Sequence, residues 1–252
     1  MSYRAPNLPP AKHCFFGSAG GYSEGFYRGL NVNTKSDDDA ARVAANLQKA
    51  AACFGLDGSR LHLLNQGVSA VTEYVEEPTQ DKMTADGAVT DRPNVVLCIR
   101  TADCAPVLLA DYEHGVVGAA HAGWRGALSG VIENTVDLMI AKGAKAESIA
   151  AAVGPCIGQA SYEVDEGFYR QFVEKDAGFA RFFAAGRAAH YQFDLEAFCR
   201  GRLEAKGIEN ISVSGLDTYA LADDYYSFRR FTHRNQVKKP KCFPTELSAV
   251  FL

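Results

Sequence analysis

Apolar residues along the chain fall into short continuous runs that predict buried strands. Residues 95–100 (VVLCIR), 105–111 (APVLLAD) and 115–123 (GVVGAAHAG) are the clearest of these runs. They are apolar at nearly every position, which is typical of strands that are buried on both faces. Further strands are predicted from the runs at 61–75, 86–90, 148–158, 211–220 and 247–252.

Four other segments carry apolar residues at the spacing that predicts amphipathic helices. The first covers residues 40–54, with Ser36 as its expected N-cap and Gly55 as its expected end. The second covers residues 127–142 and ends before Gly143. The last two begin at the expected N-caps Asp165 and Asp194, in the segments 165–176 and 194–207.

These helices and strands alternate without a regular βαβ rhythm. We therefore expect an α+β, or mixed α/β, fold with a central and largely mixed sheet. Residues 1–252 are expected to form one domain, and residues 1–16, which include the segment NLPPAK, are expected to be an irregular arm. The glycine spacing of a dinucleotide-binding loop is absent from the sequence.

Composition and charge narrow the class of protein. The 252 residues are 47% hydrophobic and 22% charged, with a formal net charge of −4, which argues against a broad nucleic-acid or anionic-membrane surface. No secretory leader and no apolar run of about 18 residues is visible. The seven cysteines are scattered and form no CxxC pair, so we expect reduced thiols, a cytoplasmic location and no four-cysteine zinc site.

Candidate chemistry concentrates in residues 101–126. Cys104 begins one apolar run and His121 ends another, so two neighbouring strands would bring a thiol and an imidazole together. The pair fits a nucleophile with its base, or two ligands of a Zn²⁺ ion. A third interpretation is that both are ordinary buried residues.

Several neighbouring residues suit a small anionic or aromatic ligand. Trp124 offers a flat surface on which a base can stack, and the candidate donors to phosphate or carboxylate are Arg125, Arg229, Arg230 and Arg100. The alternative is a core tryptophan and solvated arginines. Asp103 or Asp86 is a candidate to orient the imidazole, whereas Cys156 is expected to be a packed thiol in a turn.

The motifs TADCAPVLLAD, HAGWRG, GPCIG and YYSFRR resemble the signature blocks of the YfiH or laccase-domain family, once described as multicopper polyphenol oxidases. The resemblance extends from about Gly17 to Leu252. It implies a fold related to a bacterial cysteine-dependent deamidase toxin. It also implies a zinc-dependent purine nucleoside phosphorylase that deaminates adenosine and cleaves methylthioadenosine. Some bacterial members are linked to the editing of peptidoglycan precursors.

The resemblance implies three metal ligands, of which this chain keeps two. Cys104 and His121 match the family's cysteine and second histidine, but Val68 stands where the family has its first histidine. His62 or Asp103 is the expected substitute for the missing ligand. Ala19, Leu47 and the segment 235–246 also depart from the family pattern, and these changes reduce the expected positive charge of the site.

The resemblance and the residues together predict a purine nucleoside phosphorylase-like enzyme with zinc, or alternatively copper, at Cys104 and His121. Its partners would be a small-molecule nucleoside and phosphate, and it would be a monomer or a small homo-oligomer. Two alternatives remain open. One is a non-catalytic relative that binds a nucleoside or a partner. The other is a copper-dependent phenol oxidase, which would need many more histidine ligands than six dispersed ones.

Overall fold

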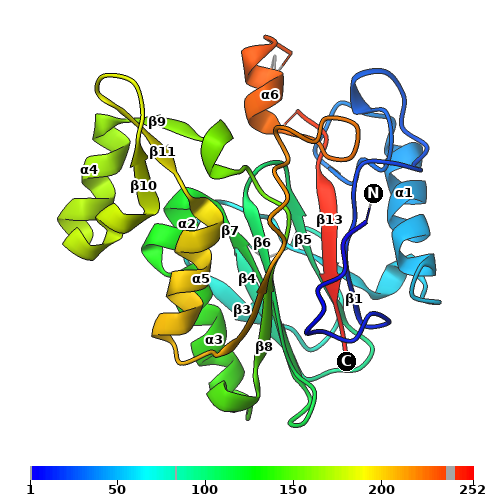
Figure 1. Cartoon of the computed structure of the whole chain (residues 1–252). Helices are drawn as coiled ribbons and strands as arrows, with labels where there is room; N and C mark the ends of the chain where they lie inside the picture. The colour runs from blue at the N-terminus through cyan, green and yellow to red at the C-terminus, as the bar shows by residue number, and fades with distance from the viewer. Residues whose placement is uncertain (1, 83, 237–241) are drawn as a thin grey trace.

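Two β-sheets lie face to face in the computed structural model, which describes residues 2–82, 84–236 and 242–252 (Figure 1). Helix α1 covers the outer face of one sheet, and helices α3 and α5 cover the outer face of the other. The mixed α/β class predicted from the sequence is confirmed. The single central sheet that we expected is instead a stacked pair, with a small third sheet beside it.

The first sheet has four strands in the order β1-β13-β5-β2, and the second has six strands in the order β12-β8-β6-β7-β4-β3. The third sheet has the order β10-β11-β9. The strands are β1 (His13–Phe15), β2 (Leu61–Leu63), β3 (Thr72–Tyr74), β4 (Gly87–Thr90), β5 (Val96–Thr101), β6 (Ala105–Asp111), β7 (Val116–Ala122), β8 (Ala150–Val153), β9 (Glu163–Asp165), β10 (Phe183–Ala185), β11 (His190–Phe193), β12 (Asn210–Val213) and β13 (Glu246–Val250). The α-helices are α1 (Ala40–Ala52), α2 (Trp124–Ser129), α3 (Val131–Ala141), α4 (Glu166–Lys175), α5 (Leu195–Ala205) and α6 (Phe228–His233).

The central strands are buried on both faces, as their apolar runs predicted. Along β6, Leu108 belongs to the core between the two sheets, whereas Leu109 belongs to the core under α3 and α5. Along β5, Leu97 likewise faces the other sheet, whereas Cys98 packs in the cluster beneath α1. Because neighbouring side chains in a strand point to opposite faces, a continuous apolar run fills two cores at once.

The second sheet mixes strand directions. β6 and β7 form an antiparallel hairpin whose register pairs Ala105 with Ala122 and Pro106 with His121. β8 also runs antiparallel to β6, whereas β12 runs parallel to β8 and β3 runs parallel to β4. The hairpin lies in the middle of the sheet, so the residues at its open end have a rigid frame.

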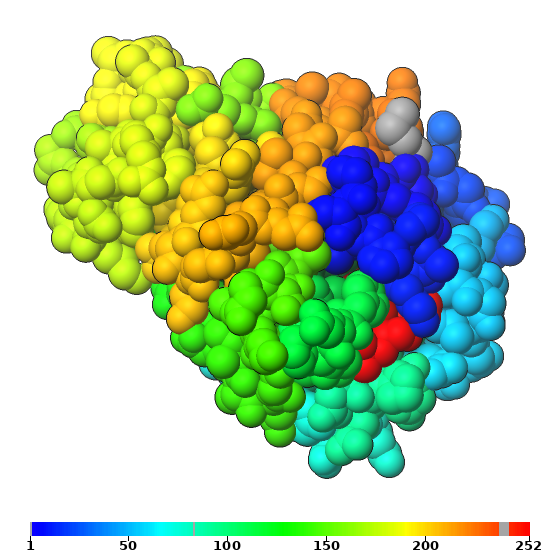
Figure 2. All heavy atoms as spheres, turned by 60° about the horizontal axis from the view of Figure 1, so that its bottom comes forward, coloured from blue at the N-terminus to red at the C-terminus, as the bar shows by residue number. Residues whose placement is uncertain are grey.

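The first residues of the chain contradict the predicted irregular arm in one place. His13–Phe15 is strand β1, which pairs antiparallel with β13 near the C-terminus. Figure 2 shows the N-terminal segment, in dark blue, lying across one face of the molecule beside the orange segment that follows α5. The Asn7 amide donates to the carbonyls of Ala151 and Asn210, both at 3.0 Å, and thereby covers the edge of the sheet at β12.

Two of the three predicted helix N-caps are confirmed, and one is wrong. Asp165 and Asp194 cap α4 and α5, because their carboxylates accept from the Phe168 and Ala197 amides at 2.7 and 2.8 Å. Asp39 caps α1, so the expected cap at Ser36 is wrong. No helix in the described ranges has both the length and the apolar character needed to cross a membrane.

The helix predicted over 127–142 is two helices. α2 begins at Trp124, three residues before the predicted start, and ends at Gly130, from which α3 then begins. Gly130 has φ 104°, a left-handed conformation that glycine adopts without strain and that ends the first helix. The break allows α2 to turn its first residues toward the open end of the β6–β7 hairpin.

A lobe formed by α4 and the sheet β10-β11-β9 projects from one side of the molecule (Figures 1 and 2). Its core is aromatic: the ring centroids of Phe168 and Phe172 are 5.1 Å apart, and those of Phe172 and Phe193 are 4.8 Å apart. Trp124 of α2 joins this cluster, with its ring centroid 4.5 Å from that of Phe168. The aromatic contacts thus attach the lobe to the main body beside α2.

Candidate active site

The β6–β7 hairpin brings Cys104 and His121 together, as their positions in the two apolar runs predicted. Cys104 directly precedes β6 and is half-buried, and His121 lies near the C-terminal end of strand β7 and is buried. The register of the hairpin sets them diagonally opposite each other, and the Cys104 thiol hydrogen-bonds to the His121 imidazole. Their side chains therefore share one site.

Asp86 orients the imidazole from the neighbouring strand. Its Oδ1 lies 2.7 Å from His121 Nδ1, and its backbone carbonyl accepts from the His121 amide at 2.6 Å. Since Nδ1 faces Asp86, Nε2 is the ring nitrogen that is left for Cys104. The three side chains form a thiol–imidazole–carboxylate arrangement in which the carboxylate fixes the ring and its tautomer.

Charge and hydrogen bonding outweigh burial at this pair. Burial lowers the pKa of His121, but the charge of Cys104 and the hydrogen bonds to Asp86 and Cys104 raise it to about 10. Burial raises the pKa of Asp86, but its hydrogen bonds to His121 and Ser69 lower it to about 2. Asp86 is therefore a carboxylate, and it keeps a proton on the imidazole.

Asp86 also holds the turn that carries Val68. Its carboxylate accepts from the backbone amides of Gly67, Val68 and Ser69 at 3.2, 3.0 and 2.5 Å. Val68 has φ 62°, a conformation that is strained for a β-branched residue, and its side chain is 42% exposed. One carboxylate thus fixes both the imidazole and the turn.

Val68 reaches the same place as the thiol. A Cβ atom built on Gly123 would lie 3.0 Å from Cys104 Sγ and 3.5 Å from Val68 Cγ1. The thiol and the hydrocarbon therefore flank one point at the start of α2. Gly123 leaves this point open, because a glycine has no side chain to occupy it.

The expected substitutes for a third metal ligand are both engaged elsewhere. His62 directs Nε2 at Glu73 Oε1 at 2.8 Å and accepts from the Thr79 amide at Nδ1. Asp103 accepts from the hydroxyls of Thr218 and Ser227 at 2.7 and 2.9 Å, and it ties the end of β5 to α6. The expectations that His62 or Asp103 completes the site, and that Asp103 orients the imidazole, are wrong.

The donor set does not fit a catalytic zinc ion, which takes about three protein ligands. No group of three imidazole, thiol or carboxylate side chains that could hold a metal ion occurs within the described residues. The seven residues outside them are methionine, valine, lysine and proline, which add no such donor. Cys104 and His121 supply two donor atoms. The side chain beside them is that of Val68, which has no donor atom.

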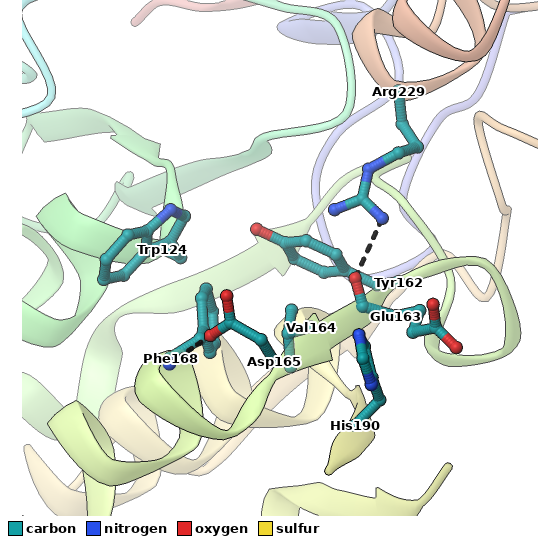
Figure 3. Close-up of a pocket in the computed structure, with 8 residues that line it drawn as sticks. All are labelled: Trp124, Tyr162, Glu163, Val164, Asp165, Phe168, His190 and Arg229. Atoms are coloured by element: carbon teal, nitrogen blue, oxygen red, sulfur yellow. Dashed lines mark hydrogen bonds between the residues drawn. The ribbon is translucent and has the colours of Figure 1, made fainter. Parts of the chain in front are cut away.

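A pocket of about 330 Å³ lies between α2, α6 and the lobe (Figure 3). Trp124 and Phe168 form one apolar side, and the Tyr162 hydroxyl points toward Trp124. The lining residues are Trp124, Tyr162, Glu163, Val164, Asp165, Phe168, His190 and Arg229. An aromatic wall with polar groups around it suits a flat, polar ligand.

One arginine lines this pocket, and a second lies over the tryptophan ring of its wall. The Arg125 guanidinium lies 4.0 Å from the centroid of the Trp124 ring, and the Arg229 guanidinium lies 5.1 Å from that of Tyr162. Arg229 also donates to the Glu163 carbonyl at 2.9 Å. Burial raises the pKa of Tyr162, and the charges of Cys104, Arg229 and Arg125 all act on its hydroxyl. The pocket and the thiol site are therefore neighbours.

Two other predicted donors serve the fold instead. Arg230 is buried and donates to the backbone carbonyls of Thr218, Tyr219 and Tyr225 at 2.7, 2.8 and 2.5 Å. These bonds engage the guanidinium in the fold, and its predicted role in binding phosphate stays a prediction. Arg100 is buried as well and forms an ion pair with Asp81 at 2.5 Å, together with a bond to a backbone carbonyl.

Cys156 matches the prediction of a packed thiol, because it is 2% exposed and belongs to the core beneath α3 and α5. Burial raises the pKa of its thiol well above the ordinary value, which keeps it protonated and unreactive.

The sequence analysis missed the pocket residues that the lobe contributes. Tyr162, Glu163 and His190 come from segments that carry no recognisable motif, and strands β9, β10 and β11 were not predicted. One signal was present: Phe168 and Phe172 follow Asp165 at helical spacing and mark the apolar face of α4. In the structure this apolar face of α4 packs on Trp124 and attaches the lobe to the main body.

Known proteins resemble this chain over most of its length. The sequence model of a family described as multi-copper polyphenol oxidoreductase laccase matches residues 12–237. A purine nucleoside phosphorylase of Deinococcus radiodurans is 40% identical over 227 residues, which cover 90% of this chain and 86% of the relative. A purine nucleoside phosphorylase of Rickettsia prowazekii is 39% identical over 77% of this chain and 79% of its own.

Solved structures show the same fold. A Neisseria meningitidis protein of the DUF152 family has a TM-score of 0.86 and 27% identity, with 100% of this chain and 98% of that chain covered. The Bacillus licheniformis hypothetical protein YfiH has a TM-score of 0.85 and 27% identity, covering 95% of this chain and 92% of its own.

Proposed function

The chain belongs to the multi-copper polyphenol oxidoreductase laccase family, and we propose that it is a purine nucleoside phosphorylase. One observation supports this proposal above all: an aromatic pocket with two flanking arginines lies beside the Cys104–His121 pair. Nucleoside phosphorolysis needs a surface for the base, cations for the phosphate and polar groups near the bond that breaks. The names of the relatives support the same activity.

In this proposal Trp124 and Tyr162 contact the purine ring, and Arg125 and Arg229 hold the phosphate. A phosphate oxygen attacks C1′ of the ribose while the bond from C1′ to the purine nitrogen breaks. The electron pair of that bond leaves with the base, and positive charge develops on the ribose. Two guanidinium groups that position the phosphate close to C1′ lower the barrier, because they fix the orientation of the attack.

Cys104 and His121 lie at the reacting end of the nucleoside in this arrangement. Asp86 holds the imidazole, so its second ring nitrogen and the thiol keep one fixed geometry. Gly123 provides the space that the substrate needs to approach them. The proposed substrates are adenosine, inosine and methylthioadenosine. Deamination of adenosine is the proposed second activity.

Product analysis tests this function. The purified protein is incubated with adenosine, inosine or methylthioadenosine, with and without inorganic phosphate, and the products are separated by chromatography. We expect phosphate-dependent release of the free base and of a ribose 1-phosphate. Conversion of adenosine to inosine would reveal deamination. Binding of nucleoside without any product would favour the alternative of a non-catalytic relative.

Copper-dependent phenol oxidation has little support from the site. Such chemistry needs several copper ions and a correspondingly large set of imidazole ligands that converge. The six histidines instead bond to separate local partners: His13 to Pro9, His62 to Glu73, His114 to Asp111, His121 to Asp86, His190 to Ala188 and His233 to Tyr219.

All seven cysteines are unpaired, which is consistent with an enzyme of the cytoplasm.

A further inference from the structure

We propose that this chain does not take a zinc ion at Cys104 and His121, and that the two side chains work with Asp86 as a metal-free triad. The inference concerns the site of the proposed function. Its test, however, measures the chemistry of the thiol and does not depend on turnover. Failure of one proposal can therefore be told apart from failure of the other.

The turn at Val68 offers no third donor to a metal ion. The backbone amides of Gly67, Val68 and Ser69 all donate to the Asp86 carboxylate, which fixes the turn and the direction of the Val68 side chain. That side chain and the Cys104 thiol flank the same point in front of Gly123. A third ligand at this turn would have to come from residue 68, and a valine has no donor atom.

Ser69 and Asp86, which lie beside Val68, cannot replace the missing donor. The Ser69 hydroxyl donates to Asp86 at 2.7 Å, and the Asp86 carboxylate accepts from the turn, from Ser69 Oγ and from His121 together. Turning Asp86 toward a metal would release the imidazole and three backbone amides at once. Each such group left without a partner destabilises the folded state, so this exchange is unfavourable.

Val68 is held in a strained backbone conformation. A β-branched residue at φ 62° is unfavourable, and the exposed apolar side chain gains little from burial. The three hydrogen bonds from the turn to Asp86 hold this conformation in place. The turn therefore supports the triad even though residue 68 supplies no ligand.

Alkylation of Cys104 by iodoacetamide tests the proposal. In this reaction an S–C bond forms at Sγ, the C–I bond breaks with iodide leaving, and the proton that the thiol has given up stays on the His121 ring or passes to water. A bound zinc ion would occupy the sulfur and slow the reaction. The full-length protein is stripped with a chelator and labelled with and without equimolar zinc, and mass spectrometry follows the Cys104 peptide. The exposed Cys53 is the reference within the same molecule.

We expect zinc to change the rate at Cys104 by less than about twofold in the wild-type protein, and by about tenfold or more in Val68→His, because a zinc site of this kind takes about three protein ligands and the variant restores the third. Val68→Gly is the matched control: it relieves the strain at φ 62° but adds no ligand, and it should behave like the wild type.

Strong protection of Cys104 by zinc in the wild-type protein, with one zinc ion per chain after dialysis, would overturn the proposal. This result requires no variant, so it decides the question even if Val68→His fails to fold. Equal protection of Val68→Gly and Val68→His would also count against it, because the third donor would then not come from residue 68.

Discussion

Asp86 Oδ1 lies 2.7 Å from His121 Nδ1, and the same carboxylate accepts from three consecutive backbone amides of the turn at Val68. One side chain therefore controls both the imidazole and the loop in front of the thiol. Asp86→Asn should lower the free energy of unfolding by about 3 kcal/mol, the cost of breaking a buried charged pair. It should also lower kcat/KM for nucleoside.

Asp111→Asn is the matched control for that change. Asp111 is also buried and pairs with a histidine, since its Oδ2 lies 2.8 Å from His114 Nδ1, but it lies at the far end of the hairpin. We expect this variant to lose stability and to keep its activity. Equal losses of activity in the two variants, measured on folded protein, would mean that Asp86 acts only through stability.

The free energy of unfolding should depend on pH because the Asp86 carboxylate takes up a proton in acid. Its pKa in the folded protein is about 2, below the ordinary value of 3.8. A carboxyl with a lowered pKa stabilises the fold above its ordinary value, and that contribution disappears as the pH falls toward 2. Urea titrations of the wild type should therefore show falling stability between about pH 4 and pH 2, and Asp86→Asn should show a smaller fall.

Trp124→Ala should weaken nucleoside binding by about 1–3 kcal/mol if the ring stacks on the purine. The ring also packs on Phe168 with a centroid distance of 4.5 Å, so the variant should melt at a lower temperature as well. Isothermal titration below the melting transition separates the two effects. Normal affinity in a folded but less stable variant would assign Trp124 to the lobe interface alone.

Arg125→Lys and Arg229→Lys should each raise the KM for phosphate by about tenfold with less effect on the KM for nucleoside, because an ammonium lacks the planar fork of a guanidinium. Arg170→Lys serves as the control, since Arg170 is exposed on α4 and pairs with Glu166 at 2.5 Å. Steady-state kinetics with varied phosphate check this. An unchanged KM in both variants would place the phosphate elsewhere.

Gly123→Ala should reduce kcat/KM by about tenfold with little change in stability, since a small displacement of the reacting groups is costly for catalysis. Gly123 has φ −68° and ψ 155°, which alanine adopts without strain, but its Cβ would lie 3.0 Å from Cys104 Sγ. Kinetics beside a thermal melt test the prediction. A melting temperature lowered in proportion to activity would show that the added methyl group disturbs packing instead.

Arg230→Met should lower the free energy of unfolding by about 3 kcal/mol, because buried carbonyls lose their donors. Activity per folded molecule should stay close to that of the wild type. Urea denaturation and kinetics on the same sample distinguish this structural role from a role in the site. A raised KM for phosphate would restore the sequence-based assignment of Arg230.

The sequence predicts the Cys104–His121 pair better than it predicts the residues around that pair. The two apolar runs around Cys104 and His121 require paired buried strands, and paired strands bring those two residues together. β7 lies between β6 and β4, so both aspartates are near it in the fold. Asp86, just before β4, bonds to the imidazole, whereas Asp103 bonds to the start of α6. Pairing between segments far apart in the sequence leaves no local signal, so the choice between the two aspartates could not be made in advance.

The lobe shows a different limit. Residues 183–193 (FAAGRAAHYQF) lack the continuous apolar run of a central strand, because β10 and β11 form a small sheet that is mostly half-exposed. The aromatic residues that stabilise it come from several segments. The contacts among Phe168, Phe183 and Phe193 become visible only when those segments are packed together.

The chain leaves the second sheet after β8, forms the lobe and α5, and returns as β12, which pairs directly with β8. Apart from Trp124 and Arg229, the residues that line the pocket therefore belong to an excursion between two adjacent strands. Its length and side chains can change without shifting the register of β6, β7 or β8, and so without moving Cys104 or His121. Ligand preference can thus diversify separately from the reactive pair, and swapping this excursion between relatives would be a direct route to altered specificity.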